Sequence, residues 1–375
     1  MRIFILCLFL NPIFSCTMMD PGTDTDQDPG ENEEIDTIGQ NLYFPPLDED
    51  IWASSNLDIL GWDMEKVQDL YQLLESNGTR AFIILVNGKL VLEKYFGKDL
   101  LNLTDFNKEK QWYWASAGKT LTAFIVGKAQ EQNYLDITNP SSDYLGQGWT
   151  SLPSDKEINI TVRNQLTMTT GLDDLVVNSN SIEPGDLIFK ADAGNRWAYH
   201  NAPYTLLDAV VESAVNSEFE DYFNSILRDA IGMDGTWQWI GDNHVYLSTA
   251  RAMARFGLLI QSQGKWEDIE IMKDKSFFDE MINPSQKINE SYGYLWWLNG
   301  YSSHMLPATQ IVFPGSISPE APTDMISGIG KNGQYLSIIP SLNMVMVRMG
   351  ENPDQVAVPI LFQNDIWKIM NEILR

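Results

Sequence analysis

The chain has 375 residues, of which 44% are hydrophobic and 11% aromatic, and its 51 acidic and 25 basic side chains give a formal net charge of −26. This composition is typical of a globular protein, and its acidity argues against nucleic-acid binding, which relies on clustered Lys and Arg. Two cysteines and three histidines exclude a disulfide scaffold and the usual four-cysteine zinc site, so we expect neither a metal nor a cofactor.

The N-terminal sequence MRIFILCLFLNPIFSC has the features of an export signal. Its apolar run is interrupted by Asn11-Pro12, well short of the roughly 20 residues that span a membrane. The last four residues resemble a bacterial lipobox, in which Cys16 would carry lipid, whereas an ordinary signal would end at Ser15. We therefore predict a lipoprotein signal in residues 1–16 and an exported protein that Cys16 anchors to a bacterial membrane, in the periplasm or at the cell surface.

An acidic segment follows the signal. Residues 17–45 are rich in Asp, Glu, Gly, Pro and Thr, and they contain too few apolar side chains to offset the entropy of ordering. Residues 17–50 hold eleven acidic and no basic side chains, so about two-fifths of the net charge belongs to the tether and its junction with the domain. The sequence thus predicts a disordered tether over 17–45 and one domain over 46–375.

Within that domain, apolar spacing predicts a helix over 63–75, and two apolar runs joined by Asn87-Gly88 predict a β-hairpin over 80–96. Strands over 334–339 and 343–349 and a helix over 356–374 end the chain. The middle is mostly helical, with helices predicted at 120–132, 204–214, 219–230 and 249–261. The fold class is therefore α+β: an antiparallel sheet built from both chain ends and flanked by helices, with an inserted helical subdomain.

Ser116-Ala117-Gly118-Lys119 begins the predicted helix over 120–132. Residues three apart share a helix face, so Lys119 is expected beside the Ser116 hydroxyl. Serine becomes nucleophilic when a neighbour takes its proton, and lysine can do so where burial lowers its pKa. The aromatic residues 112–114 could supply that burial. A second S-x-x-K, from Ser262 to Lys265, lies in a polar turn and is interpreted as a coincidence.

Tyr199-His200-Asn201 precedes a helix that has Pro203 in its first turn. A phenol beside ammonium groups can relay protons, and Asn201 can orient a substrate amide or carbonyl. His200 is interpreted as a bystander. The similar pattern at Tyr222 lies inside an amphipathic helix and is interpreted as packing.

Lys331-Asn332-Gly333-Gln334 leads into the predicted strand over 334–339. A cation and a backbone N–H group at this point could bind a substrate carboxylate and complete an oxyanion hole. The alternative is a hairpin turn with an exposed lysine.

The order S-x-x-K, Y-x-N, K-x-G resembles the penicillin-recognising serine hydrolases: class C β-lactamases, related D-Ala-D-Ala carboxypeptidases, and esterases and amide hydrolases of the same fold. Residues 165–172 (QLTMTTGL), 292–297 (YGYLWW) and 333–340 (GQYLSIIP) strengthen this resemblance, which covers roughly residues 60–370. It implies a β-lactamase-like fold and acyl transfer without metal.

The resemblance also implies a role for each motif residue. Ser116 would be the nucleophile, and Lys119 its base or base partner. Tyr199 would relay the proton to and from the leaving group. The N–H groups of Ser116 and Gln334 would form the oxyanion hole. Substrate binding would involve Asn201, Lys331, Asn332, Gly333 and Gln334.

Asn332 stands where the family usually has threonine, which commonly helps to bind the carboxylate of β-lactams, so the sequence favours other substrates. A tryptophan-rich approach resembles the branch near the 6-aminohexanoate-oligomer hydrolases and carboxylesterases, and one or two of its members are expected in the pocket. Its members are Trp112, Trp114, Trp197, Trp296 and Trp297.

We therefore predict a metal-independent serine hydrolase that cleaves an ester or amide of a small molecule or short peptide. A D,D-peptidase or β-lactamase remains an alternative within the same class. The alternative of another class is a binding or sensor lipoprotein that is non-catalytic or only slowly acylated. The oligomeric state stays open.

Overall fold

The computed structural model describes residues 42–49, 51–353 and 358–375. The predicted signal, the lipidation residue Cys16 and all but the end of the tether lie outside these residues, so they stay predictions, as do the domain boundaries. No helix in the described part of the chain is long and apolar enough to cross a membrane.

A six-stranded antiparallel sheet combines strands from both ends of the domain, in the order β2-β1-β13-β12-β11-β8. Its first hairpin confirms the Asn87-Gly88 prediction, because both residues have positive φ (51° and 81°), as a tight hairpin turn requires. The strands are β1 (Thr79–Val86), β2 (Lys89–Tyr95), β8 (Trp297–Leu298), β11 (Ile326–Gly330), β12 (Gln334–Ile339) and β13 (Met344–Gly350).

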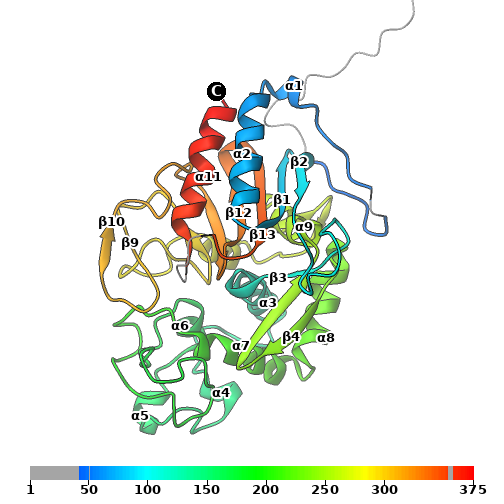
Figure 1. Cartoon of the computed structure of the whole chain (residues 1–375). Helices are drawn as coiled ribbons and strands as arrows, with labels where there is room; N and C mark the ends of the chain where they lie inside the picture. The colour runs from blue at the N-terminus through cyan, green and yellow to red at the C-terminus, as the bar shows by residue number, and fades with distance from the viewer. Residues whose placement is uncertain (1–41, 50, 354–357) are drawn as a thin grey trace, which may run out of the picture. The chain divides into compact units, whose positions relative to one another are not determined.

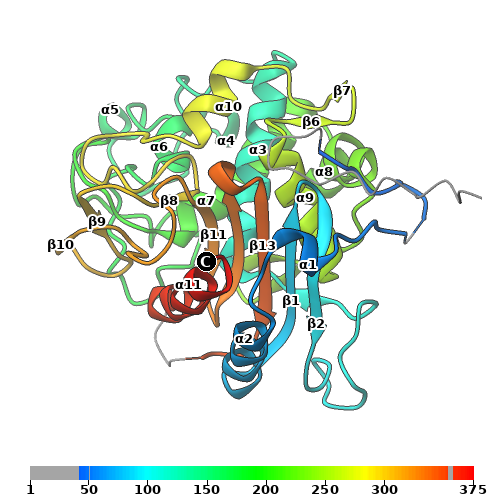
Figure 2. The ribbon, with the colours of Figure 1, turned by 90° about the horizontal axis from the view of Figure 1, so that it is seen from above.

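Helices cover both faces of this sheet. On one face α2 (Met64–Ser76) packs beside α11 (Ile360–Ile373), and α9 (Ala250–Gln261) lies across the other face (Figures 1 and 2). The carboxylate of Asp63 caps α2 by accepting from two backbone N–H groups. The last predicted helix was placed too early, because α11 begins only after Pro359.

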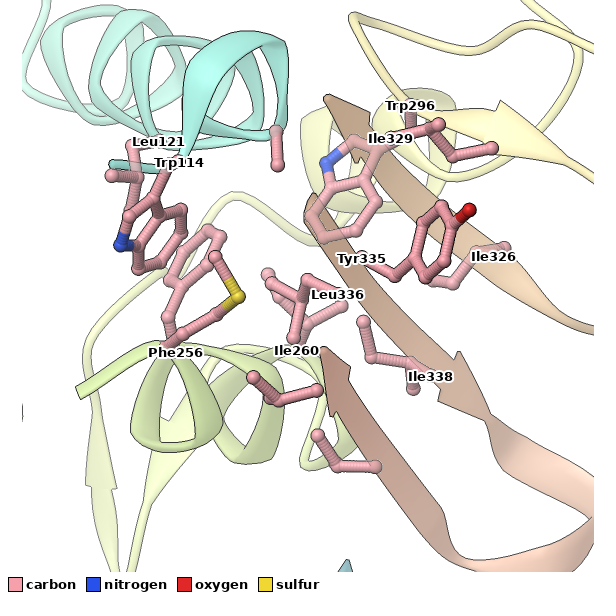
Figure 3. Packing of buried hydrophobic residues seen from close by; sticks show 14 of the residues in the cluster. Trp114, Leu121, Phe256, Ile260, Trp296, Ile326, Ile329, Tyr335, Leu336 and Ile338 are labelled. Atoms are coloured by element: carbon pink, nitrogen blue, oxygen red, sulfur yellow. The ribbon is translucent and has the colours of Figure 1, made fainter. Parts of the chain in front are cut away.

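The central strands are apolar on both faces because helices cover both, and the core on one side lies between α9 and the sheet. Phe256 and Ile260 of α9 lie in the same packed cluster as Leu336 of β12, and Trp114 packs at 6.3 Å from the Phe256 ring (Figure 3). Nearly every residue of β1, β12 and β13 is buried. The sheet is therefore a rigid platform on which flanking segments can be held.

The region inserted between β2 and β8 consists of helices joined by loops, and it contains a small sheet in the order β3-β5-β4. The helix predicted over 219–230 is helical throughout, but it changes type from α to π to 3-10. The elements are β3 (Trp112–Tyr113), η1 (Ala115–Gly118), α3 (Lys119–Glu131), α4 (Ser142–Leu145), α5 (Ser154–Glu157), α6 (Val162–Leu166), α7 (Asn201–Val215), α8 (Phe219–Phe223), η2 (Asn224–Arg228), η3 (Asp229–Ile231), β4 (Thr236–Ile240) and β5 (Asn243–Ser248).

Short elements complete the described chain: α1 (Leu57–Leu60), β6 (Lys265–Trp266), β7 (Ile269–Glu270), α10 (Lys275–Met281), β9 (Ser303–Met305), β10 (Val312–Pro314) and η4 (Pro340–Leu342). The architecture confirms the predicted fold class, a mixed fold whose antiparallel sheet uses strands from both ends of the domain.

Candidate active site

Ser116 lies in η1, the single 3-10 turn that leads directly into α3. Lys119 is the first residue of α3, and its Nζ lies 3.2 Å from Ser116 Oγ. The structure therefore confirms the predicted proximity of the two side chains.

Lys119 is almost completely buried, with 3% of its surface exposed. Its Nζ lies 4.0 Å from the ring centroid of Tyr204 and 5.3 Å from that of Tyr199. Burial lowers the pKa of Lys119 to about 7, although the charge of Asp208 acts in the opposite direction. The desolvation thus involves tyrosine rings of the Y-x-N region, whereas the sequence had suggested residues 112–114. A lysine with this pKa can accept a proton near neutral pH.

Tyr199 is held in an aromatic shell behind the serine. Its ring stacks on Trp297 at 5.7 Å and meets Tyr292 edge-on at 6.2 Å. Burial raises the pKa of the phenol well above its usual value, and its hydrogen bond to Ser116 lowers the pKa only in part. Tyr199 therefore keeps its proton at neutral pH and can serve as a donor.

A cavity of about 570 Å³ opens at Ser116, a volume typical of small-molecule sites. The three motifs meet there, since Ser116, Lys119, Tyr199, Asn201 and Lys331 all line it. The other lining residues are Tyr113, Ala115, Asp174, Ser179, Asn180, Tyr204, Ile240, Asn243, His244, Val245, Pro307, Ala308, Ile329 and Val358.

Asn201 is oriented by a neighbouring loop. Its Nδ2 donates to Asn180 Oδ1 at 2.8 Å, and its own Oδ1 is buried without a hydrogen-bond partner. That oxygen can accept from a substrate N–H group. His200 does not line the cavity, and burial lowers its pKa to about 4, so it is neutral, as expected of a bystander.

The third motif forms the turn between β11 and β12, and only its lysine reaches the cavity wall. Lys331 is exposed, which agrees with the hairpin-turn alternative as well as with a role at the cavity. Asn332 donates through Nδ2 to the hydroxyl of Tyr113 at 2.7 Å. Gly333 has φ +74°, and its carbonyl accepts from the buried Arg348 at 2.7 Å. The two middle residues therefore shape the turn and do not line the cavity.

Gln334 is also absent from the cavity wall. It pairs with Gly330 in the β11–β12 ladder, and its side-chain amide bonds the backbone of Gly350 at 2.7 and 2.9 Å. The sequence could not reveal this placement, because it depends on which side of the hairpin faces the serine.

Strand β11 is the backbone that runs beside the serine. The backbone carbonyl of Met325 accepts from the backbone N–H of Asn299, the residue directly after β8. Backbone groups alternate between the two sides of a strand, so the N–H and C=O groups of the odd-numbered residues of β11 point toward β8. β8 pairs only with Ile326 and Ser327 of β11. The N–H of Ile329 therefore lies past the end of β8 and has no partner in that strand, and Ile329 lines the cavity.

Glycine allows β11 to approach η1 so closely. A Cβ atom on Gly330 would lie 2.5 Å from the carbonyl oxygen of Trp114 and 3.0 Å from the backbone nitrogen of Ala117. Ala115, directly before the serine, has φ +47°, a strained conformation that its surroundings must hold. The backbone around Ser116 is thus held in place by close contact with β11 of the sheet.

The predicted tryptophan lining is wrong. None of the five tryptophans is among the residues that line the cavity in the described chain, and all five are buried. Their size and apolar character favour the core, and tyrosines supply the aromatic lining instead. Two coincidental motifs were interpreted correctly: Ser262 donates to the carbonyls of Leu259 and Lys265, and the Tyr222 hydroxyl bonds Gln132 at 2.9 Å.

Several residues at or beside the cavity were not predicted, among them Asn180, Tyr204, Ile329 and the buried pair Asp208–His244. Tyr204 could have been found, because it lies one helical turn after the Y-x-N motif. Asn180 and His244 come from segments far from every motif. Among the described residues no group of three or more His, Cys, Asp or Glu side chains is arranged to hold a metal ion.

Comparisons with known proteins place this geometry in a family. A penicillin-binding protein of Bacillus subtilis (strain 168), provisionally described as PbpX, is 26% identical over 177 residues, 45% of this chain but only 43% of that relative's length. A protein of Bacillus anthracis, provisionally described as a 6-aminohexanoate-dimer hydrolase, shares the fold with a TM-score of 0.63 at 19% identity, covering 90% of this chain and 88% of its own.

A class C β-lactamase mutant has a TM-score of 0.62 at 16% identity, over 82% of this chain and 96% of its own. At such identities these structures show the fold alone. The family model named Beta-lactamase matches residues 74–354, which include all three motifs. The chain therefore belongs to the beta-lactamase family of serine hydrolases.

Proposed function

We propose that the protein hydrolyses an ester or amide of a small molecule or short peptide through an acyl-enzyme on Ser116. The observation that carries this proposal is the 3.2 Å contact between Ser116 Oγ and a buried Lys119 whose pKa is about 7, at the wall of a 570 Å³ cavity. A lysine in this state can take the serine proton as Oγ attacks the carbonyl carbon.

The remaining steps follow from the neighbours of the serine. Oγ forms a bond to the carbonyl carbon, and the bond to the leaving alcohol or amine breaks as the leaving group receives a proton from Tyr199. The phenol regains a proton from Lys119. Water then attacks the acyl carbon and passes a proton to the same groups. The bond between that carbon and Ser116 Oγ breaks, Oγ regains a proton from these groups, and the carboxylic acid leaves. Asn201 Oδ1 would accept from a substrate amide N–H, and Lys331 would add positive potential at the cavity mouth.

The developing oxyanion needs two donors. We assign these to the N–H groups of Ser116 and Ile329, in place of the pair with Gln334 that the motif had suggested. The register of β11 supports this, because the Ile329 N–H points to the side of the strand that β8 leaves uncovered.

Covalent labelling tests the proposal. A fluorophosphonate should add one mass increment to the wild-type protein and none to Ser116→Ala. Ser262→Ala is the matched control, since it alters the second S-x-x-K serine and should be labelled like wild type. An unlabelled wild type, or equal labelling of Ser116→Ala, would contradict the proposal. Turnover of a p-nitrophenyl ester compared with nitrocefin separates an esterase from a β-lactamase.

The D,D-peptidase and β-lactamase alternatives have less support, because Asn332 Nδ2 is already bonded to Tyr113 and does not line the cavity. A slowly acylated sensor would keep the same residues, and an acyl adduct that persists for hours would favour it. Lipid anchoring also stays a proposal. In a bacterial host, Cys16→Ser should lose both radiolabelled palmitate and sedimentation with membranes, and retention of both would contradict the anchor.

A further inference from the structure

Asp208 and His244 form a buried carboxylate–imidazole pair that the proposed mechanism does not use. They lie on α7 and β5, and Asp208 Oδ2 is 2.7 Å from His244 Nδ1. Only 6% of Asp208 and 7% of His244 is exposed. A buried carboxylate is costly unless a partner compensates for it, so its position needs an explanation.

Helix α7 connects this pair with Lys119. Tyr204 lies one turn before Asp208 on α7, so both side chains share a helix face, and the Tyr204 ring lies 4.0 Å from Lys119 Nζ. The charge of Asp208 acts on Lys119, whereas its Oδ1 is buried without a hydrogen-bond partner. Lys119 has no ion pair with any carboxylate in the described part of the chain.

His244 is fixed on several sides. Its ring stacks on Trp239 at 4.5 Å with 8° between the planes, and it lines the cavity beside Asn243 and Val245. Its Nε2 lies 3.6 Å from Glu220 Oε1. Because the ring cannot turn freely, its bond to Asp208 fixes the orientation of the carboxylate.

We propose that Asp208, oriented by His244, is a positioning residue whose negative charge acts on Lys119 from beside Tyr204 and sets the pH range in which Lys119 acts as a base. The inference rests on the proposed function of Lys119. It adds to the three motifs a residue nine positions after Tyr199, on the helix that begins at Asn201.

The ionisation states agree with this role. Burial raises the pKa of Asp208 to about 6, the hydrogen bond from His244 lowers it in part, and the charges of Glu212 and Glu220 raise it. Asp208 is therefore mostly ionised above pH 7, where its charge favours the ammonium form of Lys119.

The other titratable groups near Lys119 do not replace that charge. Burial raises the pKa of both Tyr199 and Tyr204, so these phenols stay neutral. Of the charged residues at the cavity, Asp174 is held by Arg196 at 2.6 Å, and Lys331 lies on the exposed turn.

The test is the rate at which a fluorophosphonate labels Ser116 as a function of pH. In Asp208→Asn, Lys119 should lose its proton more readily, so the acidic limb of the profile should move to lower pH by on the order of one unit. The plateau at high pH should remain, because Lys119 is neutral there in both proteins. Glu109→Gln is the control for net charge, because it neutralises an exposed carboxylate outside the cavity and should leave the limb unchanged.

A second variant keeps the test decisive if Asp208→Asn does not fold, which a thermal melt would reveal. His244→Phe keeps an aromatic ring on Trp239 but removes the donor to Asp208, so the carboxyl should be protonated at higher pH and the limb should again move to lower pH. The double variant should match Asp208→Asn alone, since the histidine acts through the aspartate. An unchanged limb, a shift to higher pH or additive shifts would overturn the inference, whereas an unlabelled wild type would overturn the proposed function itself.

Discussion

The chain contains the pattern S-x-x-K twice, and the two copies have opposite surroundings. Ser116 and Lys119 face each other at a cavity, with the lysine buried among tyrosine rings. Ser262, directly after α9, donates its hydroxyl to two backbone carbonyls. The Lys265 side chain is exposed, and its Nζ lies 3.7 Å from Glu270 Oε1. Identical spacing therefore gives a reactive pair only where the fold removes water from the lysine and leaves the serine oxygen accessible.

The largest difference between the copies should appear in catalysis. Lys119→Met keeps the length of the side chain but removes the base, so kcat/KM for a p-nitrophenyl ester should fall by roughly 10²- to 10⁴-fold. Lys265→Met should leave kcat/KM unchanged. Equal losses, or no loss in Lys119→Met, would contradict the distinction between the two sites.

The next largest effect should come from disturbing the close approach of β11 to the turn η1 that holds Ser116. Gly330→Ala would place a methyl group 2.5 Å from the Trp114 carbonyl and push β11 away from η1. We expect kcat/KM to fall about 100-fold, because misplacement by about 1 Å costs that much, with a smaller loss of stability. Gly185→Ala is the control, since its Cβ would meet no atom within 4 Å. Wild-type kinetics in Gly330→Ala would show that the close approach is not needed.

A smaller effect should appear in the pH dependence of kcat/KM, which should depend on Lys119 and not on Lys265. Because Lys119 must be neutral to accept a proton and its pKa is about 7, kcat/KM should fall about tenfold per unit below pH 7. Lys265→Met should show the same limb as wild type. A limb that is flat down to pH 5 would argue against Lys119 as the base.

The smallest expected effect is on stability, and it has the opposite sign to the loss of activity. The ordinary pKa of lysine is 10.5, so between pH 7 and 10.5 the unfolded chain binds more protons at this position than the folded chain. The free energy of unfolding should therefore rise with pH across that window, and the cost of the buried charge is largest below pH 7. Lys119→Met should be more stable than wild type at pH 6, by roughly 1–3 kcal/mol. Chemical denaturation checks this, and a destabilised variant would show that the lysine contributes net stability.

Local signals predicted the elements that depend on few neighbours. The helix that starts near Asp63, the turn at Asn87-Gly88 and the apolar strands near the C-terminus were predictable from residues adjacent in sequence. The change of helix type after Phe223 was not predictable, because it depends on packing against other segments.

The residues of the candidate site also differ in whether they could be predicted from local sequence. Ser116 and Lys119, three residues apart, could be paired from helical geometry alone. The preference for Ile329 over Gln334 depends on strand pairing, and the bond between Asp208 and His244 joins residues 36 positions apart. Such contacts follow from the fold, which motif spacing does not encode.

The most direct test of the account is to identify the residue that carries the acyl group. A p-nitrophenyl ester can be mixed with the protein, quenched in acid during turnover, and digested for mass spectrometry. The acyl increment is expected on the peptide that contains Ser116, and no increment on the peptide that contains Ser262. An adduct on Ser262 or another residue, with Ser116 unmodified, would contradict it.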